Sequence, residues 1–213
     1  MTKMLPLLIL FITFFGCNST QEKQEKIMEE KQAITSESVD TITLGGGCFW
    51  CVEAVFLRMK GVVSATSGYS GGFVKNPAYR EVCNGTTGHT EVVQVAFNKN
   101  ETSLEDILSV FFVVHDPTTP NRQGNDVGTQ YRSAIYYHDD NQKKIVQDAI
   151  KKLTDQKVFP DKIITEVAPI ANFYKAEDYH QNYYNQNSSE PYCRFVVKSK
   201  VDKFEKLFKD KAK

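Results

Sequence analysis

The chain has 213 residues, of which 41% are hydrophobic and 24% are charged, which is the composition of a folded globular protein. Lysine plus arginine and aspartate plus glutamate both total 26, so the formal net charge is zero. A chain without excess positive charge has no overall field to hold nucleic acid. Composition therefore excludes a wholly disordered chain and argues against a nucleic-acid partner.

The first sixteen residues have the form of an export signal. Lys3 precedes an apolar run from Leu5 to Phe15, which is shorter than the roughly 20 residues a helix needs to span a bilayer. The run ends in Phe-Phe-Gly-Cys, which resembles the lipobox of bacterial lipoproteins, where a small residue precedes the lipidated cysteine. We predict a lipoprotein signal peptide at residues 1–16 with lipidation at Cys17. A plain cleaved signal peptide is the alternative.

The segment that follows is polar and acidic. From Asn18 to Asp40 there are six acidic residues and three lysines, with almost no large apolar side chains. Such a segment cannot bury enough surface to fold by itself. We predict that residues 17–40 are the lipidated cysteine and a flexible tether, and that residues 41–213 form one folded domain. The protein is then expected to be exported, in the periplasm or cell envelope, and lipid-anchored to a bacterial membrane.

Short strands and helices alternate through the predicted domain. Alternating apolar residues predict strands at 41–44, 62–69, 91–97, 133–138 and 162–170. Apolar residues at helical spacing predict helices at 48–59, 103–114, 141–156, 175–184 and 201–208. Glycines 45–47 predict a turn. Several strand pairs have no helix between them, so we predict an α+β fold. This fold is a two-layer sandwich with a ferredoxin-like core, in which helices pack on a mixed or antiparallel sheet.

Cys48 lies where the glycine turn passes into the first predicted helix. Free backbone N–H groups and the positive end of the helix dipole favour the thiolate at such a position. Phe49 and Trp50 follow it, and their rings would offer an apolar wall to a sulfur-containing substrate. Cys51 completes a Cys-x-x-Cys spacing that is typical of a redox motif or a disulfide. An unreactive buried cysteine is the alternative for Cys48.

Seven blocks of sequence together resemble the A-type peptide methionine sulfoxide reductases. They occur in the family's order from Thr41 to about Val197: Gly47–Trp50 with Glu53, Gly68–Gly72, Asn76–Cys83, Gly88–Val93, His115–Thr118, Gly124–Ser133 and Asp178–Gln181. The resemblance implies that the domain is an oxidoreductase that reduces the S epimer of methionine sulfoxide, either free or in oxidised proteins, which it thereby repairs. It also implies no bound cofactor and an external, thioredoxin-like dithiol donor.

The resemblance also implies roles for individual residues. Cys48 matches the nucleophile, which becomes a sulfenic acid as methionine leaves. Glu91 matches the acid that protonates the sulfoxide oxygen, and burial would raise its pKa for that task. Tyr79 and Tyr131 match the phenols that hydrogen-bond the same oxygen. The remaining matches are Asp126, an acid that organises the pocket, and Phe49 with Trp50, the seat of the S-methyl group.

A second thiol must then reduce the sulfenic acid. Cys193 matches a C-terminal position at which many family members carry this resolving cysteine. Cys51 replaces the glycine that commonly follows the GCFW motif. We prefer Cys193 to Cys51 because two cysteines so close at a helix start must distort the backbone to bond. Cys83 is predicted to be a buried residue without a role in the reaction.

Two other functions fit part of this pattern. A thiol-disulfide oxidoreductase would use Cys48 and Cys51 and would need neither Glu91 nor the two tyrosines. A surface module that binds methionine-rich segments would not need the Cys48 thiol. The cysteine and histidine spacings form no closed zinc set, so no metal site is predicted. We expect a monomer that meets the membrane only through its lipid.

Overall fold

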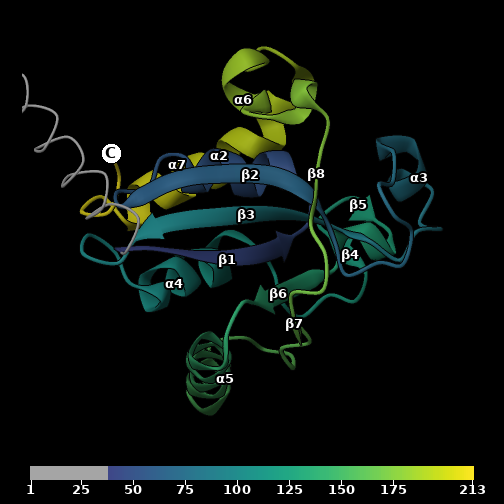
Figure 1. The fold of residues 1–213 in the computed structure, drawn as a ribbon. Coiled ribbons are helices and arrows are strands. Elements are labelled where there is room, and N and C mark those ends of the chain that lie inside the picture. Colours follow the sequence, from purple (N-terminus) through teal and green to yellow (C-terminus); the bar gives the residue numbers. More distant parts are fainter. Residues whose placement is uncertain (1–37) are drawn as a thin grey trace, which may run out of the picture. The chain divides into compact units, whose positions relative to one another are not determined.

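The structure is a computed structural model that describes residues 38–213, which are coloured from purple to yellow in Figure 1. The predicted signal peptide, Cys17 and nearly all of the predicted tether lie outside the described residues. The first strand, β1, begins at Val39, so residues 39 and 40 belong to the sheet and not to the tether. None of the helices in the described part of the chain has the length and apolar character needed to cross a bilayer.

A six-stranded mixed sheet forms the centre of the fold, with the strand order β7-β6-β1-β3-β2-β8. Its strands are β1 (Val39–Gly46), β2 (Val62–Ser70), β3 (Thr90–Asn98), β6 (Ser133–Tyr137), β7 (Glu166–Pro169) and β8 (Tyr174–Lys175). Only β6 and β7 pair in parallel, and the other neighbours are antiparallel. The predicted α+β class with a mixed sheet is confirmed.

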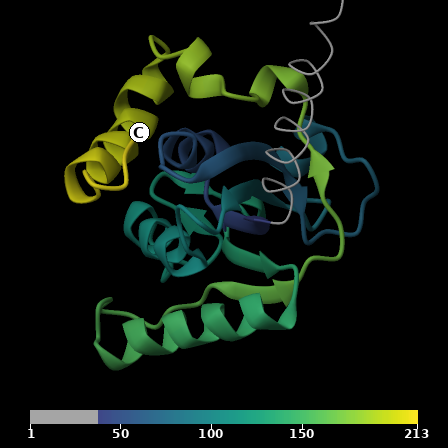
Figure 2. The ribbon, with the colours of Figure 1, turned by 60° about the vertical axis from the view of Figure 1, so that its left-hand side comes forward.

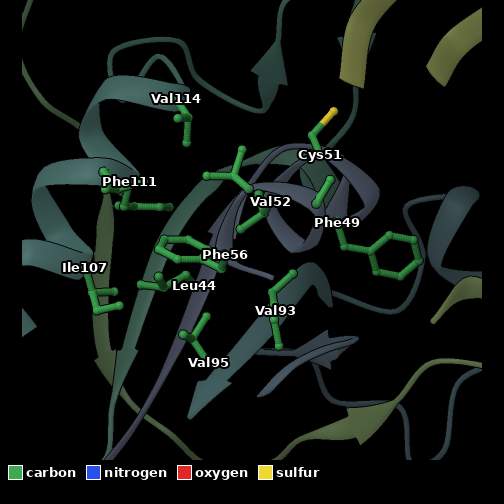
Figure 3. Close-up of a cluster of buried hydrophobic side chains, with 14 of the residues drawn as sticks. Leu44, Phe49, Cys51, Val52, Phe56, Val93, Val95, Ile107, Phe111 and Val114 are labelled. Carbon is green, nitrogen blue, oxygen red and sulfur yellow. The ribbon is translucent and has the colours of Figure 1, made fainter. Parts of the chain in front are cut away.

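Helices lie against this sheet and against one another (Figures 1 and 2). The longer ones are α2 (Phe49–Phe56), α4 (Leu104–Val114), α5 (Asp140–Asp155) and α7 (Lys198–Leu207). Figure 3 shows the core between them, where Phe56 of α2 and Phe111 of α4 lie beside Leu44 and Val93 of the sheet. These four side chains are fully buried, and each contributes about 1.5–3 kcal/mol of hydrophobic stabilisation.

The opposite face of the sheet is covered by the connection between β7 and β8. β7 and β8 lie at opposite edges, so the connection between them crosses the sheet, as Figure 1 shows. Phe173 of this connection packs on a small buried cluster that includes Val92 and Tyr136. At Gly68 a side chain would come within 2.5 Å of the Phe173 ring, so the close crossing requires glycine there. The crossing carries the chain after residue 174 to the β2 edge, beside α2.

Helix starts follow the local sequence closely. At α4, the Ser103 hydroxyl accepts a hydrogen bond from the Asp106 N–H at 3.1 Å, and the Asp106 carboxylate accepts one from the Ser103 N–H at 3.4 Å. These two reciprocal bonds form a capping box. At α5, the Asp139 carboxylate accepts a hydrogen bond from the Gln142 N–H at 2.8 Å. Both caps satisfy N–H groups that have no partner within the helix.

Two expectations for the C-terminal half are wrong. The predicted helix at 175–184 is instead the end of β8, a 3₁₀ turn at Asp178–His180 and the short helix α6 (Tyr183–Gln186). Sheet pairing of β8 with β2 takes the first residues, and Asn182 has a left-handed φ of 52° that interrupts helix geometry. The predicted strand at 162–170 is reduced to β7, because only residues 166–169 pair with β6.

The glycine turn is also shorter than predicted. Gly45 and Gly46 lie in β1 and pair with β6, and only Gly47 has a positive φ, of 87°. A Cβ at Gly47 would lie 2.5 Å from Cγ of Gln123. Gln123 belongs to a small hairpin that the sequence analysis did not predict, formed by β4 (Arg122–Gln123) and β5 (Asp126–Val127). Gly47 therefore turns the chain into α2 and lets this hairpin approach it.

Candidate active site

Cys48 is the residue before α2, and its side chain is buried, with 7% exposed. Burial raises the pKa of the Cys48 thiol well above its usual value, and the nearby Cys51 and Glu91 add to this. The expectation that the helix start lowers this pKa is therefore wrong for the protein without substrate. Desolvation outweighs the helix dipole here, since α2 is only eight residues long and the thiol has little contact with water.

Cys51 lies one helical turn further on and faces Cys48. Its N–H donates to the Cys48 carbonyl at 3.1 Å, and the two thiols lie close enough to shift each other's pKa. The Cys48 thiol lowers the pKa of Cys51, with a smaller contribution from the positive charge of Lys200 on α7. Burial, together with Cys51 and Glu91, thus favours the protonated form of Cys48.

Glu91 of β3 is 1% exposed and lies directly beneath the start of α2. Its Oε2 accepts a hydrogen bond from the N–H of Phe49 at 3.0 Å. Burial raises the pKa of Glu91 to about 8, although the Phe49 N–H opposes the shift. The carboxyl group therefore holds a proton at neutral pH, next to the residue that follows Cys48. This environment is the one that the proton-donor role requires.

Tyr79 and Tyr131 converge on the same carboxyl group from different elements. Tyr79 begins the short helix α3 (Tyr79–Cys83), and Tyr131 ends a 3₁₀ turn at Thr129–Tyr131. Burial raises the pKa of both phenols, and the charge of Glu91 raises them further, so both stay protonated donors. Cys83 is half-buried and not buried as predicted, and its thiol lies close enough to the Tyr79 hydroxyl to raise the pKa of that phenol.

Asp126 of β5 is bound by a tyrosine that the sequence analysis did not single out. The Tyr192 hydroxyl donates to Oδ2 of Asp126 at 2.6 Å. Burial, together with the charges of Cys48 and Cys51, raises the pKa of Tyr192. Tyr192 precedes Cys193 in the sequence, and this position is the only feature of the sequence that could have indicated a place in the site. Tyr192 therefore contacts Asp126 and lies close enough to the thiol pair for its pKa to be affected by the two sulfur atoms.

Phe49 and Trp50 form an aromatic wall at the start of α2. Trp50 stacks on Tyr183 with ring centroids 3.8 Å apart and an angle of 8° between the planes. Its Nε1–H donates to Nδ1 of His180 at 3.1 Å. Phe49 lies between Trp50 and Tyr79, with ring centroids 6.2 and 6.4 Å away. The wall thus faces the same space as the Tyr79 phenol.

Cys193 is fully buried in a five-residue π-helical segment, Cys193–Val197. Burial raises the pKa of its thiol, and the charge of Cys51 adds to the effect. The four cysteines within residues 38–213 are all free thiols. The structure therefore places Cys51 against Cys48, and places Cys193 close enough to Cys51 to feel its charge. In the part of the chain that the structure describes, no group of three or more cysteine, histidine or acidic side chains could hold a metal ion.

A carboxyl group that holds its proton at neutral pH, next to a pair of free thiols, equips a thiol-dependent oxidoreductase that acts on a polar oxygen. Comparison with known proteins agrees with this class. The family model for peptide methionine sulfoxide reductases matches residues 40–212. The chain belongs to this family, whose members reduce methionine sulfoxide.

Named relatives and solved structures support the assignment. The chain is 55% identical over 172 residues to a peptide methionine sulfoxide reductase MsrA of Trichodesmium erythraeum, covering 81% of this chain and 97% of that relative. It is 54% identical to an MsrA of Saccharolobus solfataricus, covering 82% of this chain and 98% of the relative. The reduced form of Mxr1 from Saccharomyces cerevisiae has a TM-score of 0.68 at 36% identity, covering 74% of this chain and 90% of Mxr1. The methionine sulfoxide reductase A of Corynebacterium diphtheriae has a TM-score of 0.63 at 39% identity, covering 70% of this chain and 76% of that structure.

Proposed function

We propose that this enzyme reduces the S epimer of methionine sulfoxide, free or within proteins, with Cys48 as nucleophile and Glu91 as proton donor. The observation that carries the proposal is the hydrogen bond of 3.0 Å between Oε2 of Glu91 and the N–H of Phe49, which holds a protonated acid beside Cys48. The Tyr79 and Tyr131 hydroxyls supply two further donors for the sulfoxide oxygen. Phe49 and Trp50 seat the S-methyl group.

The first step transfers oxygen from one sulfur to the other. The Cys48 sulfur attacks the sulfoxide sulfur while Glu91 protonates the sulfoxide oxygen, which makes the substrate sulfur more electrophilic. The hydroxyl group then moves from the substrate sulfur to the Cys48 sulfur as the bond between the two sulfur atoms breaks, and the thiol proton of Cys48 replaces the proton that Glu91 gave up. The products are methionine and the Cys48 sulfenic acid, so the substrate is reduced and the thiol is oxidised by two electrons.

The second step removes the sulfenic acid. Because Cys51 lies one turn from Cys48 and the two thiols shift each other's pKa, we propose Cys51 as the first resolving thiol, in place of Cys193, which motif position favours. Its sulfur displaces the hydroxyl group of the sulfenic acid, forming a Cys48–Cys51 disulfide and releasing water. Cys193 then exchanges with Cys51 and frees Cys48, and an external thioredoxin-like dithiol reduces the new disulfide. The first turn of α2 must distort for the first disulfide to form.

Epimer-resolved turnover of methionine sulfoxide with a dithiol reductant tests the proposal. We expect only the S epimer to be consumed and Glu91→Gln to reduce turnover at least 100-fold, in the range of general-acid catalysis. Glu205→Gln is the matched control, because Glu205 is an exposed carboxylate on α7. A thiol-disulfide oxidoreductase would instead keep its disulfide exchange activity unchanged in Glu91→Gln, and full sulfoxide turnover by that variant would refute the acid role.

We further propose that residues 1–16 are a lipoprotein signal, that Cys17 carries the lipid, and that the segment after Cys17 connects it to the catalytic domain, whose first strand begins at Val39. The support is the short apolar run and the lipobox resemblance in the sequence. An exported enzyme would receive electrons from a carrier in the periplasm or membrane. Cell fractionation of wild type and Cys17→Ala tests the anchor, and wild type in the soluble fraction would refute it. Light scattering tests the expected monomer.

A further inference from the structure

Glu177 joins two elements that carry site residues, although it has no place in the proposed chemistry. It follows β8, where the chain has crossed the sheet to the β2 edge. Its Oε2 accepts a hydrogen bond from the Tyr69 hydroxyl at 2.8 Å, and its Oε1 accepts one from the Tyr79 N–H at 2.9 Å. Tyr69 is a fully buried residue of the sheet, whereas Tyr79 lies outside the sheet in α3. Glu177 thus ties α3 to the core.

The helix α3 needs such a tie because it is short and remote. It has five residues and lies in the long connection between β2 and β3, at a distance from the sheet in Figure 1. A helix of this length is not stable by itself. Its N-terminal cap residue, Ala78, has no side-chain oxygen, so the first N–H of the helix, that of Tyr79, finds its acceptor in Glu177.

Glu177 also faces the aromatic wall through His180, three residues on. Since the Trp50 Nε1–H donates to Nδ1 of His180, the imidazole proton is on Nε2 in the neutral ring. Nε2 is buried and makes no hydrogen bond within residues 38–213, and it lies 3.9 Å from Oε2 of Glu177. The His180 ring is 4.3 Å from the Tyr79 ring and 5.6 Å from the Trp50 ring, measured between centroids. The turn that carries Glu177 and His180 therefore contacts both Tyr79 of α3 and Trp50 of the aromatic wall.

The Glu177 carboxylate is suited to this position because it stays ionised. Burial opposes ionisation, but the Tyr79 N–H and the Tyr69 hydroxyl lower the pKa of Glu177 below its usual value. Hydrogen bonds to an ionised acceptor are stronger than bonds between neutral groups. A neutral or shorter side chain at this position would hold α3 less firmly.

We propose that Glu177 is a positioning residue for the reaction: by holding the backbone of Tyr79, it keeps the Tyr79 phenol where it meets the sulfoxide oxygen. The proposal rests on the proposed function, in which Tyr79 donates to that oxygen. Glu177 itself does not touch the substrate. Its loss lets α3 move and withdraws a donor that acts most strongly as charge develops on the oxygen in the transition state.

A double-mutant cycle between Glu177→Ala and Tyr79→Phe tests this. We expect Glu177→Ala to lower kcat about tenfold in the wild-type background, as for one charge-assisted hydrogen bond, and less than twofold when Tyr79 is already Phe. Amide exchange at Tyr79, followed by NMR, should be at least tenfold faster in Glu177→Ala. Asp178→Asn is the control, because Asp178 is exposed and pairs only with Lys175, so kcat and exchange should not change.

The outcomes separate the two claims. An equal loss of kcat from Glu177→Ala in both backgrounds, or unchanged exchange at Tyr79, overturns the positioning role while Tyr79 keeps its own. Wild-type turnover by Tyr79→Phe removes the role of Tyr79, and the positioning role falls with it, whereas Cys48→Ser still reports on the nucleophile. If Glu177→Ala does not fold, Glu177→Gln takes its place in the cycle, since it keeps the size of the side chain and removes one of the two acceptor oxygens.

Discussion

The buried Glu91 carboxyl group is expected to lower the free energy of unfolding at neutral pH, and the substitution Glu91→Gln measures by how much. In the folded protein burial raises the pKa of Glu91 to about 8, against an ordinary 4.5. Keeping a group with an ordinary pKa of 4.5 protonated at pH 7 costs roughly 3 kcal/mol, and Gln, which is always neutral, avoids this. The Gln side-chain oxygen can still accept the Phe49 N–H, so the substitution should stabilise the fold while it abolishes proton donation.

The pH dependence gives the sharper test. Because the pKa of Glu91 is raised by folding, its contribution to stability is fully present below pH 4.5 and is lost as pH rises to about 8. The stability gained by Glu91→Gln should therefore be near zero at pH 4.5, roughly 3 kcal/mol at pH 7 and roughly 5 kcal/mol above pH 8. Urea unfolding at these pH values, with reductant present, measures it. A gain that does not vary with pH would refute the reasoning, and Glu205→Gln should show no gain beyond about 0.5 kcal/mol.

Three further predictions concern the proton, the thiols and the turn. The kcat/KM of the wild type should fall as pH rises through about 8, because Glu91 then loses the proton that it donates. A kcat/KM that stays unchanged up to pH 9.5 would contradict this. After one equivalent of sulfoxide, peptide mapping should find a Cys48–Cys51 disulfide in the Cys193→Ser protein. The Cys51→Ser protein should instead accumulate the Cys48 sulfenic acid. If Cys51→Ser forms a Cys48–Cys193 disulfide at the wild-type rate, Cys193 is the first resolving thiol. Gly47→Ala should lower the free energy of unfolding by at least 1 kcal/mol, because φ is 87° and the new Cβ meets Gln123 at 2.5 Å, and chemical denaturation measures it.

Local sequence signals predicted the elements that local physics decides. The Ser103 cap, the amphipathic α5 and the alternating strands β2 and β3 all lie within two residues of their predicted positions. The segment at 175–184 was predicted wrongly because its helical spacing competes with pairing of β8 to β2, which joins residues more than a hundred positions apart. No periodicity within the segment records that partner.

The candidate site divides in the same way. Motif position selected Cys48, Glu91, Tyr79 and Tyr131, and the structure places the other three side chains near the carboxyl group of Glu91. Tyr192 was missed because its hydroxyl reaches Asp126 only through the folding of the C-terminal segment onto β5. Motif position favoured Cys193 over Cys51 as the resolving thiol, but it cannot record how the sulfur atoms lie at the start of α2.

Residue type, short-range spacing and motif order were sufficient to predict the α+β class and the family, and to select Cys48 and Glu91 as candidate site residues. The protonation states of the site residues and their hydrogen-bond partners depend on the tertiary structure. Burial keeps the protons on Cys48 and Glu91, although the helix start alone would favour a thiolate at Cys48, and the chain crossing after β7 brings Glu177 to Tyr79. Desolvation and contacts between distant residues arise only when the sheet has closed over the site, so no local pattern could show them.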